Sequence, residues 1–376
     1  MSQSRPTVQH CTDRRIPLAL LTAALLAACS APGEGPSGAP SGAVSTSESR
    51  VQPGAATASS DLEVVDGVVL AIHGGAGTIL RKNMTPETDA AYRAALEEAL
   101  KAGYAVLAAG GSSLDAVEAA IAPMEDSPLF NAGRGAVLTD DGHAELDASI
   151  MSGANGMAGA IAGARTPRHP LAVARSVMET SPHVLLSGAG ADRFAGERKH
   201  ETMDPAWFVT PRRSEQLRKM KAKDDGASLD ALGPDRKYGT VGCVAVDGEG
   251  HLAAGTSTGG MARKAWGRIG DSPLIGAGTW ADDRTCAVSC TGHGEFFIRK
   301  AIAHQLHARM LWGGADLEAA ARGAVLEDLP IGGGSGGCVA LDADGRMVAP
   351  FTTPGMYRGW VDADGNVTVR IHGDER

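Results

Sequence analysis

A glycine–threonine pair, Gly239-Thr240, stands where a charged stretch of the chain runs into an apolar one. A threonine hydroxyl is a weak nucleophile at neutral pH and needs a base. If the chain were cut before Thr240, that residue would also carry a free α-amine, whose pKa of about 7.7–8.0 suits the task. Gly239 has no side chain and could expose its carbonyl to the hydroxyl. On its own, however, such a pair more often marks an ordinary loop-to-strand junction.

Two opposite charges, Arg268 and Asp271, follow downstream. A guanidinium offers a planar fork that matches a carboxylate, and an aspartate suits an ammonium group. Together they fit the head of a free amino acid whose side-chain carbonyl reaches Thr240. Without further motifs, a surface salt bridge of about 0–1 kcal/mol explains them equally well. Thr291-Gly292 precede a helix-like stretch, and amides near a helix start favour a developing oxyanion.

The elements that would position these residues begin with a buried strand predicted over Val64–Ile72. A glycine cluster, His73 to Gly77, follows it and permits close backbone approach. The cluster matches neither phosphate-binding glycine pattern. His73 is by itself more typical of a hydrogen-bonded structural histidine than of a catalyst.

Two helices are predicted next. Thr85 can cap the first, with Pro86 at its first position. Ser112 or Ser113 can cap the second, which is expected to stop near Pro123. Helices that lead into short strands indicate an α+β fold or a layered αββα arrangement.

The stretch from Asp192 to Tyr238 is charged, interrupted by proline and poor in periodic apolar residues. We therefore expect it to be mobile. Its basic run, Arg212–Lys223, is read as a solvated loop or helix face. The chain then becomes a buried strand over Thr240–Asp247. Two side chains of this strand point one way and three the other: Val244 and Val246 against Val241, Cys243 and Ala245.

Composition limits the function classes. The 376 residues are 43% hydrophobic, 21% charged and 4% aromatic, as in a globular protein. The net charge of −9 argues against a nucleic-acid partner. No zinc-ligand spacing is present, which argues against a metallohydrolase. Four cysteines are expected to be small buried hydrophobes: Cys243, Cys286, Cys290 and Cys338.

The first residues read as an export signal. Arg14 and Arg15 precede an apolar run, Ile16 to Ala28, that is too short for a permanent membrane helix. The run ends in Leu26-Ala27-Ala28-Cys29, which resembles the lipobox of bacterial lipoproteins and implies lipidation of Cys29. We therefore expect a lipoprotein signal peptide at 1–28 and a flexible tether, rich in Gly, Ser, Pro and Ala, at 29–60. The alternatives are a plain secretory signal and a buried apolar segment. The expected location is the bacterial envelope, at the periplasmic face of the outer membrane if the cell is Gram-negative.

Six short motifs follow one another along the chain, and together they resemble the motif order of a known family. They are His73-Gly74-Gly75-Ala76-Gly77, Phe130-Asn131-Ala132-Gly133, Gly239-Thr240-Val241-Gly242, Gly255-Thr256-Ser257-Thr258-Gly259-Gly260, Gly267-Arg268-Ile269-Gly270-Asp271-Ser272-Pro273 and Cys290-Thr291-Gly292-His293-Gly294-Glu295. Each motif is weak alone. From about residue 64 to 376, the chain closely resembles the plant-type asparaginase/isoaspartyl-peptidase branch of the N-terminal nucleophile hydrolases.

The resemblance implies a four-layer αββα sandwich cut between Gly239 and Thr240. The α chain would span 61–239, with a mobile tail at 192–239, and the β chain 240–376. A dimer of these αβ pairs is also implied. The resemblance makes Thr240 the nucleophile and base, and Thr258 the residue that orients its hydroxyl. The remaining implied roles are an oxyanion hole of Thr291 and the Gly292 amide, a carboxylate grip by Arg268, an ammonium site of Asp271 and the Gly294 carbonyl, and further substrate contacts by His293 and Asn131.

The implied reaction is hydrolysis of the β-aspartyl amide bond of isoaspartyl dipeptides or L-asparagine, which releases L-aspartate. No cofactor is implied for the chemistry. A structural Na⁺ is implied on backbone carbonyls of one loop: Met124, Glu125, Ser127, Phe130, Ala132 and Arg134. Tyr238 departs from the family, some members of which have His there, and that puts the rate of self-cleavage in doubt. The alternatives are a glycosylasparaginase and a non-catalytic envelope lipoprotein that keeps the fold.

Overall fold

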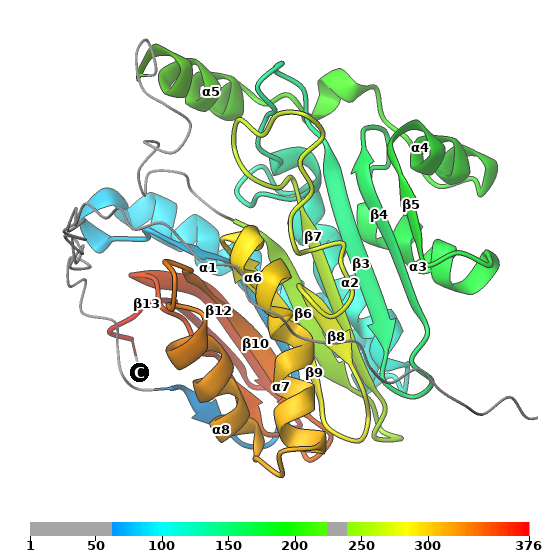
Figure 1. Ribbon diagram of the computed structural model, residues 1–376, viewed down its shortest axis with the longest axis vertical. Coiled ribbons are helices and arrows are strands. Elements are labelled where there is room, and N and C mark those ends of the chain that lie inside the picture. The colour runs from blue at the N-terminus through cyan, green and yellow to red at the C-terminus, as the bar shows by residue number, and fades with distance from the viewer. Residues whose placement is uncertain (1–61, 224–238, 376) are drawn as a thin grey trace, which may run out of the picture. The chain divides into compact units, whose positions relative to one another are not determined.

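The computed structural model describes residues 62–223 and 239–375 (Figure 1). The predicted signal peptide, Cys29, the tether, Tyr238 and the end of the predicted mobile tail lie outside the described residues. Within the described ranges, no helix is long and apolar enough to cross a membrane.

Two β-sheets form the framework. The larger has eight strands in the order β13-β12-β2-β6-β7-β3-β4-β5, and the smaller has five in the order β1-β11-β10-β9-β8. β4 and β5 pair in parallel. The strand bounds are β1 Val64–Val65, β2 Val68–Gly77, β3 Leu146–Ser152, β4 Ala158–Ala164, β5 Leu185–Ser187, β6 Val241–Val246, β7 Leu252–Thr258, β8 Thr279–Ala281, β9 Cys286–Gly292, β10 Gly336–Asp342, β11 Met347–Val348, β12 Gly355–Asp362 and β13 Val367–His372.

Helices accompany both sheets. Their bounds are α1 Pro86–Ala108, α2 Ser113–Asp126, α3 Pro170–Thr180, α4 Gly188–Glu197, α5 Pro211–Lys223, α6 Gly294–Lys300, α7 Ile302–Leu311 and α8 Leu317–Ala321. Short 3₁₀ turns lie at Arg81–Asn83, Gly133–Gly135 and Pro205–Phe208, and a π-helical turn at Arg322–Asp328.

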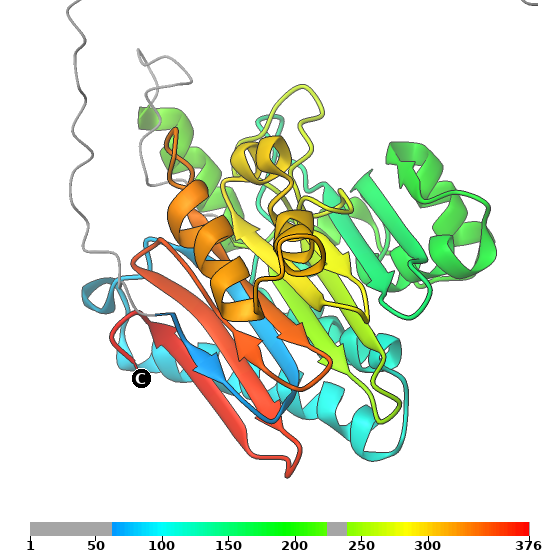
Figure 2. The same ribbon diagram turned by 60° about the horizontal axis from the view of Figure 1, so that its bottom comes forward.

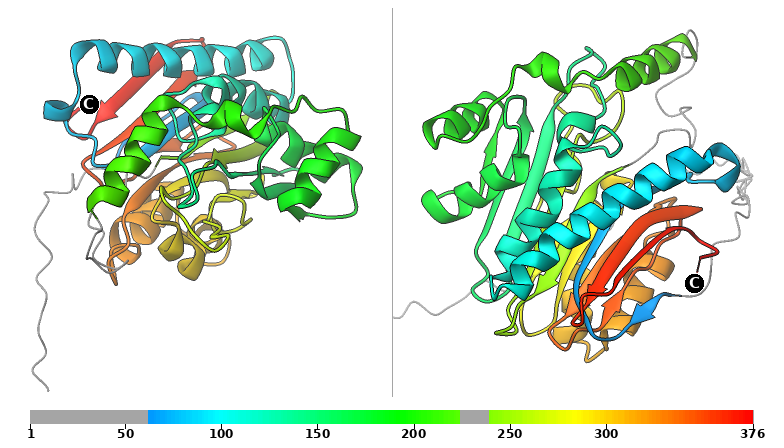
Figure 3. Two further views of the ribbon diagram at one scale, coloured as in Figure 1. Left: turned by 90° about the horizontal axis from the view of Figure 1, so that it is seen from above. Right: turned by 180° about the vertical axis from the view of Figure 1, so that it is seen from behind.

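Four apolar clusters hold the described elements together, and three of them join the helices and the two sheets. Helices α1 and α2 run along one face of the larger sheet, where Leu96 and Ile121 pack with Ile72 and Cys243 (Figure 3). A second cluster contains Val244 of the larger sheet together with residues of the smaller one. Helices α7 and α8 cover the smaller sheet in Figure 2, and their apolar side chains join those of β9 and β10. The described residues thus form a mixed fold of helices and two sheets.

Local signals account for several elements. Thr85 and Ser112 cap α1 and α2 by accepting hydrogen bonds from Thr88 N and Asp115 N, and Pro86 opens α1 as predicted. On β6, the alternation of side chains also holds. Val244 and Val246 belong to the cluster shared with the smaller sheet, and the other three side chains belong to the cluster shared with the helices.

Two predicted boundaries are wrong. Helix α2 continues through Pro123 to Asp126, because proline removes only its own N–H and the Pro123 carbonyl still accepts from Ser127 N. The first strand does not run unbroken over Val64–Ile72. It turns at Gly67, whose φ is 76°, and then β2 extends to Gly77. The glycine cluster is therefore part of a strand that pairs with β12.

The stretch predicted as a mobile tail contains a 3₁₀ turn and helix α5 within its described part. The basic run forms α5, and most of its described side chains are exposed or half-buried, as expected. Arg213 is the exception, because its side chain is buried. Mobility of the remainder stays a prediction.

Candidate active site

Thr240 lies immediately before β6, beside the end of the neighbouring strand β7. Its side chain is buried, and its hydroxyl donates to Thr258 Oγ1 over 3.1 Å. Thr258 therefore occupies the place expected of a residue that orients the Thr240 hydroxyl.

The carbonyl of Gly239 is held by two donors. Asn131 Nδ2 donates to it at 2.5 Å, and Thr258 Oγ1 donates to it at 3.2 Å. Thr258 is thus both the acceptor for Thr240 and a donor to the carbonyl of the Gly239–Thr240 peptide bond. A developing negative charge on that carbonyl oxygen would meet donors already in place.

Gly75 on β2 packs directly against this peptide bond. A Cβ atom on Gly75 would lie 2.8 Å from Gly239 Cα and 3.2 Å from Thr240 N. The φ angle of Gly75 is 111°, which side chains rarely adopt. A glycine is therefore required here for two independent reasons, conformation and space.

His73 supports Thr240 from behind. Its Nδ1–H donates to the Thr240 carbonyl at 3.0 Å, so its Nε2 accepts from Ser289 Oγ at 3.0 Å. Burial lowers the pKa of His73 to about 3, and the Thr240 hydrogen bond opposes that shift only in part. His73 is therefore neutral and structural, as expected from the sequence.

Arg268 has a partner that sequence reasoning missed. Its Nε and Nη2 atoms each donate to the Glu295 carboxylate at 2.9 Å. Burial opposes ionisation of Glu295, but hydrogen bonds from His293 and Arg268 hold its pKa well below the usual range. A guanidinium has five N–H donors, so its Nη1 edge remains for a second carboxylate.

Asp271 has a different environment. It is 5% exposed, and among the described residues its Oδ2 atom has no hydrogen-bond partner. Burial raises the pKa of Asp271 to about 7, although its own backbone amide and the Arg268 guanidinium oppose that shift. A Cβ atom on Gly294 would lie 2.8 Å from both Arg268 Nη2 and Asp271 Oδ1, so a bare glycine brings the two charges together.

One cleft collects most of the predicted residues, and we call it the catalytic cleft. It is lined by Gly239, Thr240, Thr258, Gly260, Met261, Arg268, Gly270, Asp271, Ser272 and Gly292. A hydroxyl nucleophile, a cation and an anion thus share one small space. This is the arrangement expected for an amino-acid head with a side-chain carbonyl.

The other predicted site residues are placed around this cleft. Thr291 precedes Gly292 on β9, and its hydroxyl accepts from Ala76 N at 3.3 Å. His293 lies 3.3 Å from Glu295 and packs on the Phe296 ring. Asn131 lines a neighbouring cavity instead, where it also donates to Gly260 O at 2.8 Å. The predicted substrate contacts of these residues stay predictions.

Carbonyls of the predicted Na⁺ loop converge on two glycines. A Cβ atom would lie 2.2 Å from Glu125 O if built on Gly133, and 1.9 Å from Phe130 O if built on Gly135. Carbonyl oxygens are the ligands that a hard cation prefers, and glycine lets the chain approach them closely here. One of these carbonyls already has a hydrogen-bond donor, because Arg213 Nη2 donates to Phe130 O at 3.3 Å. Within the described ranges, no three His, Cys, Asp or Glu side chains are grouped so as to hold a metal.

Buried Lys264 is a second cation that the sequence did not reveal. Its ammonium lies 3.6 Å from carboxylate oxygens of Glu145 and Asp147, and 3.5 Å from Glu145 O. Lys264 belongs to the same loop as Arg268, and its charge pairs fix that loop against β3. Its neighbours in the sequence give no sign of this burial, because the carboxylates that pair with it, Glu145 and Asp147, lie far earlier in the chain.

Sequence comparisons with known proteins identify a family and relatives that resemble this chain. The sequence model of a family described as asparaginase matches residues 66–371. An isoaspartyl peptidase of Salmonella typhimurium is 48% identical over 310 residues, which cover 81% of this chain and 98% of the relative. The isoaspartyl peptidase of Escherichia coli is 48% identical over 309 residues, covering 81% and 96%. A putative isoaspartyl peptidase/L-asparaginase of Dictyostelium discoideum is 41% identical, covering 79% and 94%.

Proposed function

The chain belongs to this asparaginase family, and on that premise we propose that it is an isoaspartyl peptidase/L-asparaginase that activates itself by cleavage before Thr240. It hydrolyses β-aspartyl dipeptides and L-asparagine and releases L-aspartate. One observation carries the proposal: the hydrogen-bonded path from the Thr240 hydroxyl through Thr258 to the Gly239 carbonyl.

In the self-cleavage step, Thr240 Oγ1 attacks the carbonyl carbon of Gly239. The C–N bond breaks, the Thr240 nitrogen takes the hydroxyl proton, and an ester joins the two residues. Asn131 and Thr258 donate to the carbonyl oxygen as it gains charge. Water then hydrolyses the ester, which leaves a carboxylate on Gly239 and a free amine on Thr240.

In the catalytic step, the Thr240 amine takes the proton from its own hydroxyl, and the oxygen attacks the β-carbonyl carbon of the substrate. The amine returns the proton to the leaving nitrogen, and a β-aspartyl ester remains on Thr240. Water hydrolyses that ester. Arg268 binds the α-carboxylate of the substrate, and Asp271 with the Gly294 carbonyl binds its α-amine. Thr291 and the Gly292 amide stabilise the oxyanion.

The fold and assembly are part of the proposal. The contacts of α1 and α2 with the larger sheet, and of α7 and α8 with the smaller one, support a four-layer αββα sandwich of the N-terminal nucleophile hydrolase type. A dimer of αβ pairs and a structural Na⁺ on the loop from Met124 to Arg134 follow from the family resemblance. Export and lipid anchoring at Cys29 rest on the sequence alone.

The test begins with a denatured mass spectrum of purified residues 61–376 after incubation at neutral pH. We expect two fragments that divide at Gly239/Thr240. Thr240→Ser keeps a hydroxyl and should also divide, whereas Thr240→Ala should stay whole. An intact wild-type chain after days of incubation would overturn self-activation.

Substrate preference is tested on the cut protein. We expect turnover of β-aspartyl-leucine and L-asparagine above that of a glycosylated asparagine. A preference for the glycosylated compound would make the protein a glycosylasparaginase. No turnover of any of the three would favour a binding role for this fold.

A further inference from the structure

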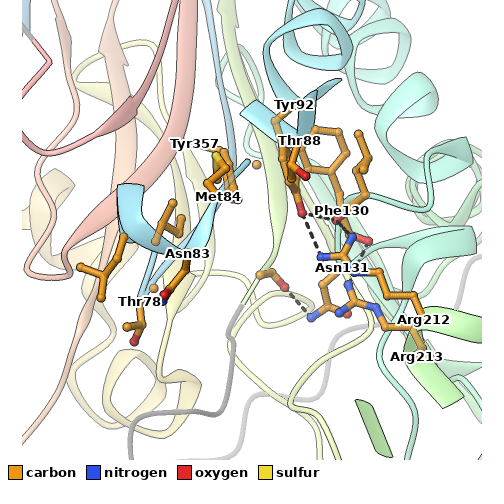
Figure 4. A pocket seen from close by; sticks show the side chains of 16 residues that line it. Thr78, Asn83, Met84, Thr88, Tyr92, Phe130, Asn131, Arg212, Arg213 and Tyr357 are labelled. Carbon is orange, nitrogen blue, oxygen red and sulfur yellow. Dashed lines mark hydrogen bonds between the residues drawn. The ribbon is translucent and has the colours of Figure 1, made fainter. Parts of the chain in front are cut away.

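A second cavity of about 160 Å³ shares only Gly239 with the catalytic cleft. We call it the arginine cavity; Figure 4 shows its lining residues. They are Gly74, Gly77, Thr78, Ile79, Leu80, Asn83, Met84, Thr88, Tyr92, Leu129, Phe130, Asn131, Arg212, Arg213, Gly239 and Tyr357. A buried water needs about 10–15 Å³ of such space, so the cavity admits a group much larger than water or ammonia.

The charged side chains that line this cavity are all positive. Its lining includes two arginines and no aspartate or glutamate, although the whole chain carries a net charge of −9. Arg212 donates to the Tyr92 hydroxyl at 3.1 Å and to Leu129 O at 3.4 Å. Within residues 62–223 and 239–375, the acceptors of Arg212 are thus neutral, and the same holds for Arg213. An anionic ligand would complete this arrangement.

The two arginines have different tasks. Arg213 is buried and bonds to Gly135 O at 2.6 Å, Phe130 O at 3.3 Å and Gln216 Oε1 at 2.9 Å, so it holds the loop below the cavity. Arg212 is exposed at the rim. Its guanidinium uses two donors on Tyr92 and Leu129 and has others left for a ligand.

The chemistry of the reaction indicates the direction in which the leaving group points from Thr240. The Thr240 amine must return its proton to the leaving nitrogen, so that nitrogen ends beside Thr240 N. This is the space that Gly239, bonded to Thr240 N, fills in the uncut chain. Because Gly239 also lines the arginine cavity, a leaving group there points toward the cavity once Gly239 has withdrawn.

We propose that the arginine cavity is the leaving-group subsite, and that Arg212 binds the α-carboxylate of the amino acid released from a β-aspartyl dipeptide. The stacked rings of Tyr92 and Tyr357, whose centroids are 4.3 Å apart, offer an apolar wall to that amino acid's side chain. Ammonia leaving from L-asparagine reaches neither feature. This inference rests on the proposed function, and it makes the dipeptide the substrate that the whole site fits.

The experiment compares three substrates on the cut enzyme: β-aspartyl-leucine, the same dipeptide with a C-terminal amide, and L-asparagine. Wild type should prefer the free acid over the amide about five- to tenfold in kcat/KM, the effect of one exposed charge-assisted contact. Arg212→Gln should abolish this preference and leave asparagine turnover unchanged within about twofold. Arg218→Gln is the matched control, because Arg218 lies on the same helix and pairs with exposed Glu215 outside the cavity.

Several results would overturn the proposal. Equal rates of wild type on acid and amide would do so, and so would an equal loss on both in Arg212→Gln. A rise on both would indicate that Arg212 instead holds the new carboxylate of Gly239. If wild type turned over none of the three substrates, the proposed function itself would be refuted, which keeps the two failures distinct.

Discussion

The catalytic cleft and the arginine cavity share Gly239 but solve different recognition problems. In the cleft, Arg268 is fixed by a two-pronged bond to Glu295, and buried Asp271 supplies the opposite charge. In the cavity, Arg212 bonds only neutral acceptors among the described residues and stands at the rim. Every substrate brings the same aspartyl head, so rigid charges suit the cleft. Leaving groups vary, so a looser cation suits the cavity.

The largest expected effect comes from Gly75, which packs against the Gly239–Thr240 peptide bond. Gly75→Ala would place a Cβ atom 2.8 Å from Gly239 Cα. Because the clash is with backbone, the Gly239–Thr240 peptide bond must leave the position in which Asn131 and Thr258 hold its carbonyl. We expect self-cleavage to slow by more than about 100-fold, the loss seen when an oxyanion donor is removed. A time course of denatured mass spectra measures it.

Gly67→Ala is the matched control. Gly67 also has a positive φ, 76°, but a Cβ atom there would meet nothing within 4 Å. It should destabilise the protein by about 1 kcal/mol and leave the rate of cleavage unchanged. If both variants cut at the same reduced rate, backbone conformation rather than contact with Gly239 would be responsible.

Asp271→Asn would remove the carboxylate that faces Arg268 in the catalytic cleft, so that the cleft, like the arginine cavity, would be lined by positive charge alone. We expect kcat/KM to fall about 100-fold on both asparagine and dipeptide, because a buried amide cannot replace a carboxylate facing an ammonium. In wild type, kcat/KM should fall as the pH drops below about 7, where free Asp271 becomes protonated. Protonation of the Thr240 amine gives both proteins an acid limb, but the additional fall below about pH 7 should be missing in Asp271→Asn, and pH–rate profiles of both proteins decide it.

The same carboxyl group affects stability with the opposite sign. The folded pKa of Asp271, about 7, lies above its ordinary value of 3.8. The folded state therefore binds the proton more tightly, and stability falls as pH rises from about 4 to about 7. Asp271→Asn should be more stable than wild type at pH 8, by about 2–4 kcal/mol, and no more stable at pH 4. Urea unfolding at the two pH values measures this, and equal differences at both would contradict it.

A smaller effect is expected when the ion pair between Arg268 and Glu295 is weakened. Glu295→Gln should raise KM about three- to tenfold on every substrate and leave kcat nearly unchanged, because Arg268 is then positioned by one neutral acceptor. Arg268 in the catalytic cleft would then be held as loosely as Arg212 in the arginine cavity. A selective loss on the dipeptide acid would contradict this assignment and place Glu295 with the leaving group.

The smallest effect concerns the predicted Na⁺ loop. Phe130 and Asn131 line the arginine cavity, so a looser loop should disturb the cavity before the cleft. Replacing Na⁺ by choline should lower Tm by about 2–4 °C and reduce dipeptide turnover about twofold, with asparagine turnover less affected. Thermal scans and rates in the two salts test this. Identical values in both would remove the ion from the proposal.

The sequence predicted what local chemistry decides. Thr85 and Ser112 are recognisable caps because their partners lie three residues on, and β6 alternates because a strand has two faces. Features that depend on distant partners were missed. Glu295 fixes Arg268 from 27 residues away, and Arg213 is buried by carbonyls 78 and 83 residues away. A charged side chain gives no local sign that such partners exist.

The contact between Asn131 and the Gly239 carbonyl joins residues 108 positions apart. It forms only when the chain has folded, so an unfolded chain carries no formed catalytic machinery. Once folded, the chain presents its own peptide bond to Thr240 at an effective molarity of about 10⁵–10⁸ M, which no dissolved peptide can match. Under the proposed self-cleavage, each molecule therefore cuts its own chain first, and folding sets the moment at which the enzyme begins to work.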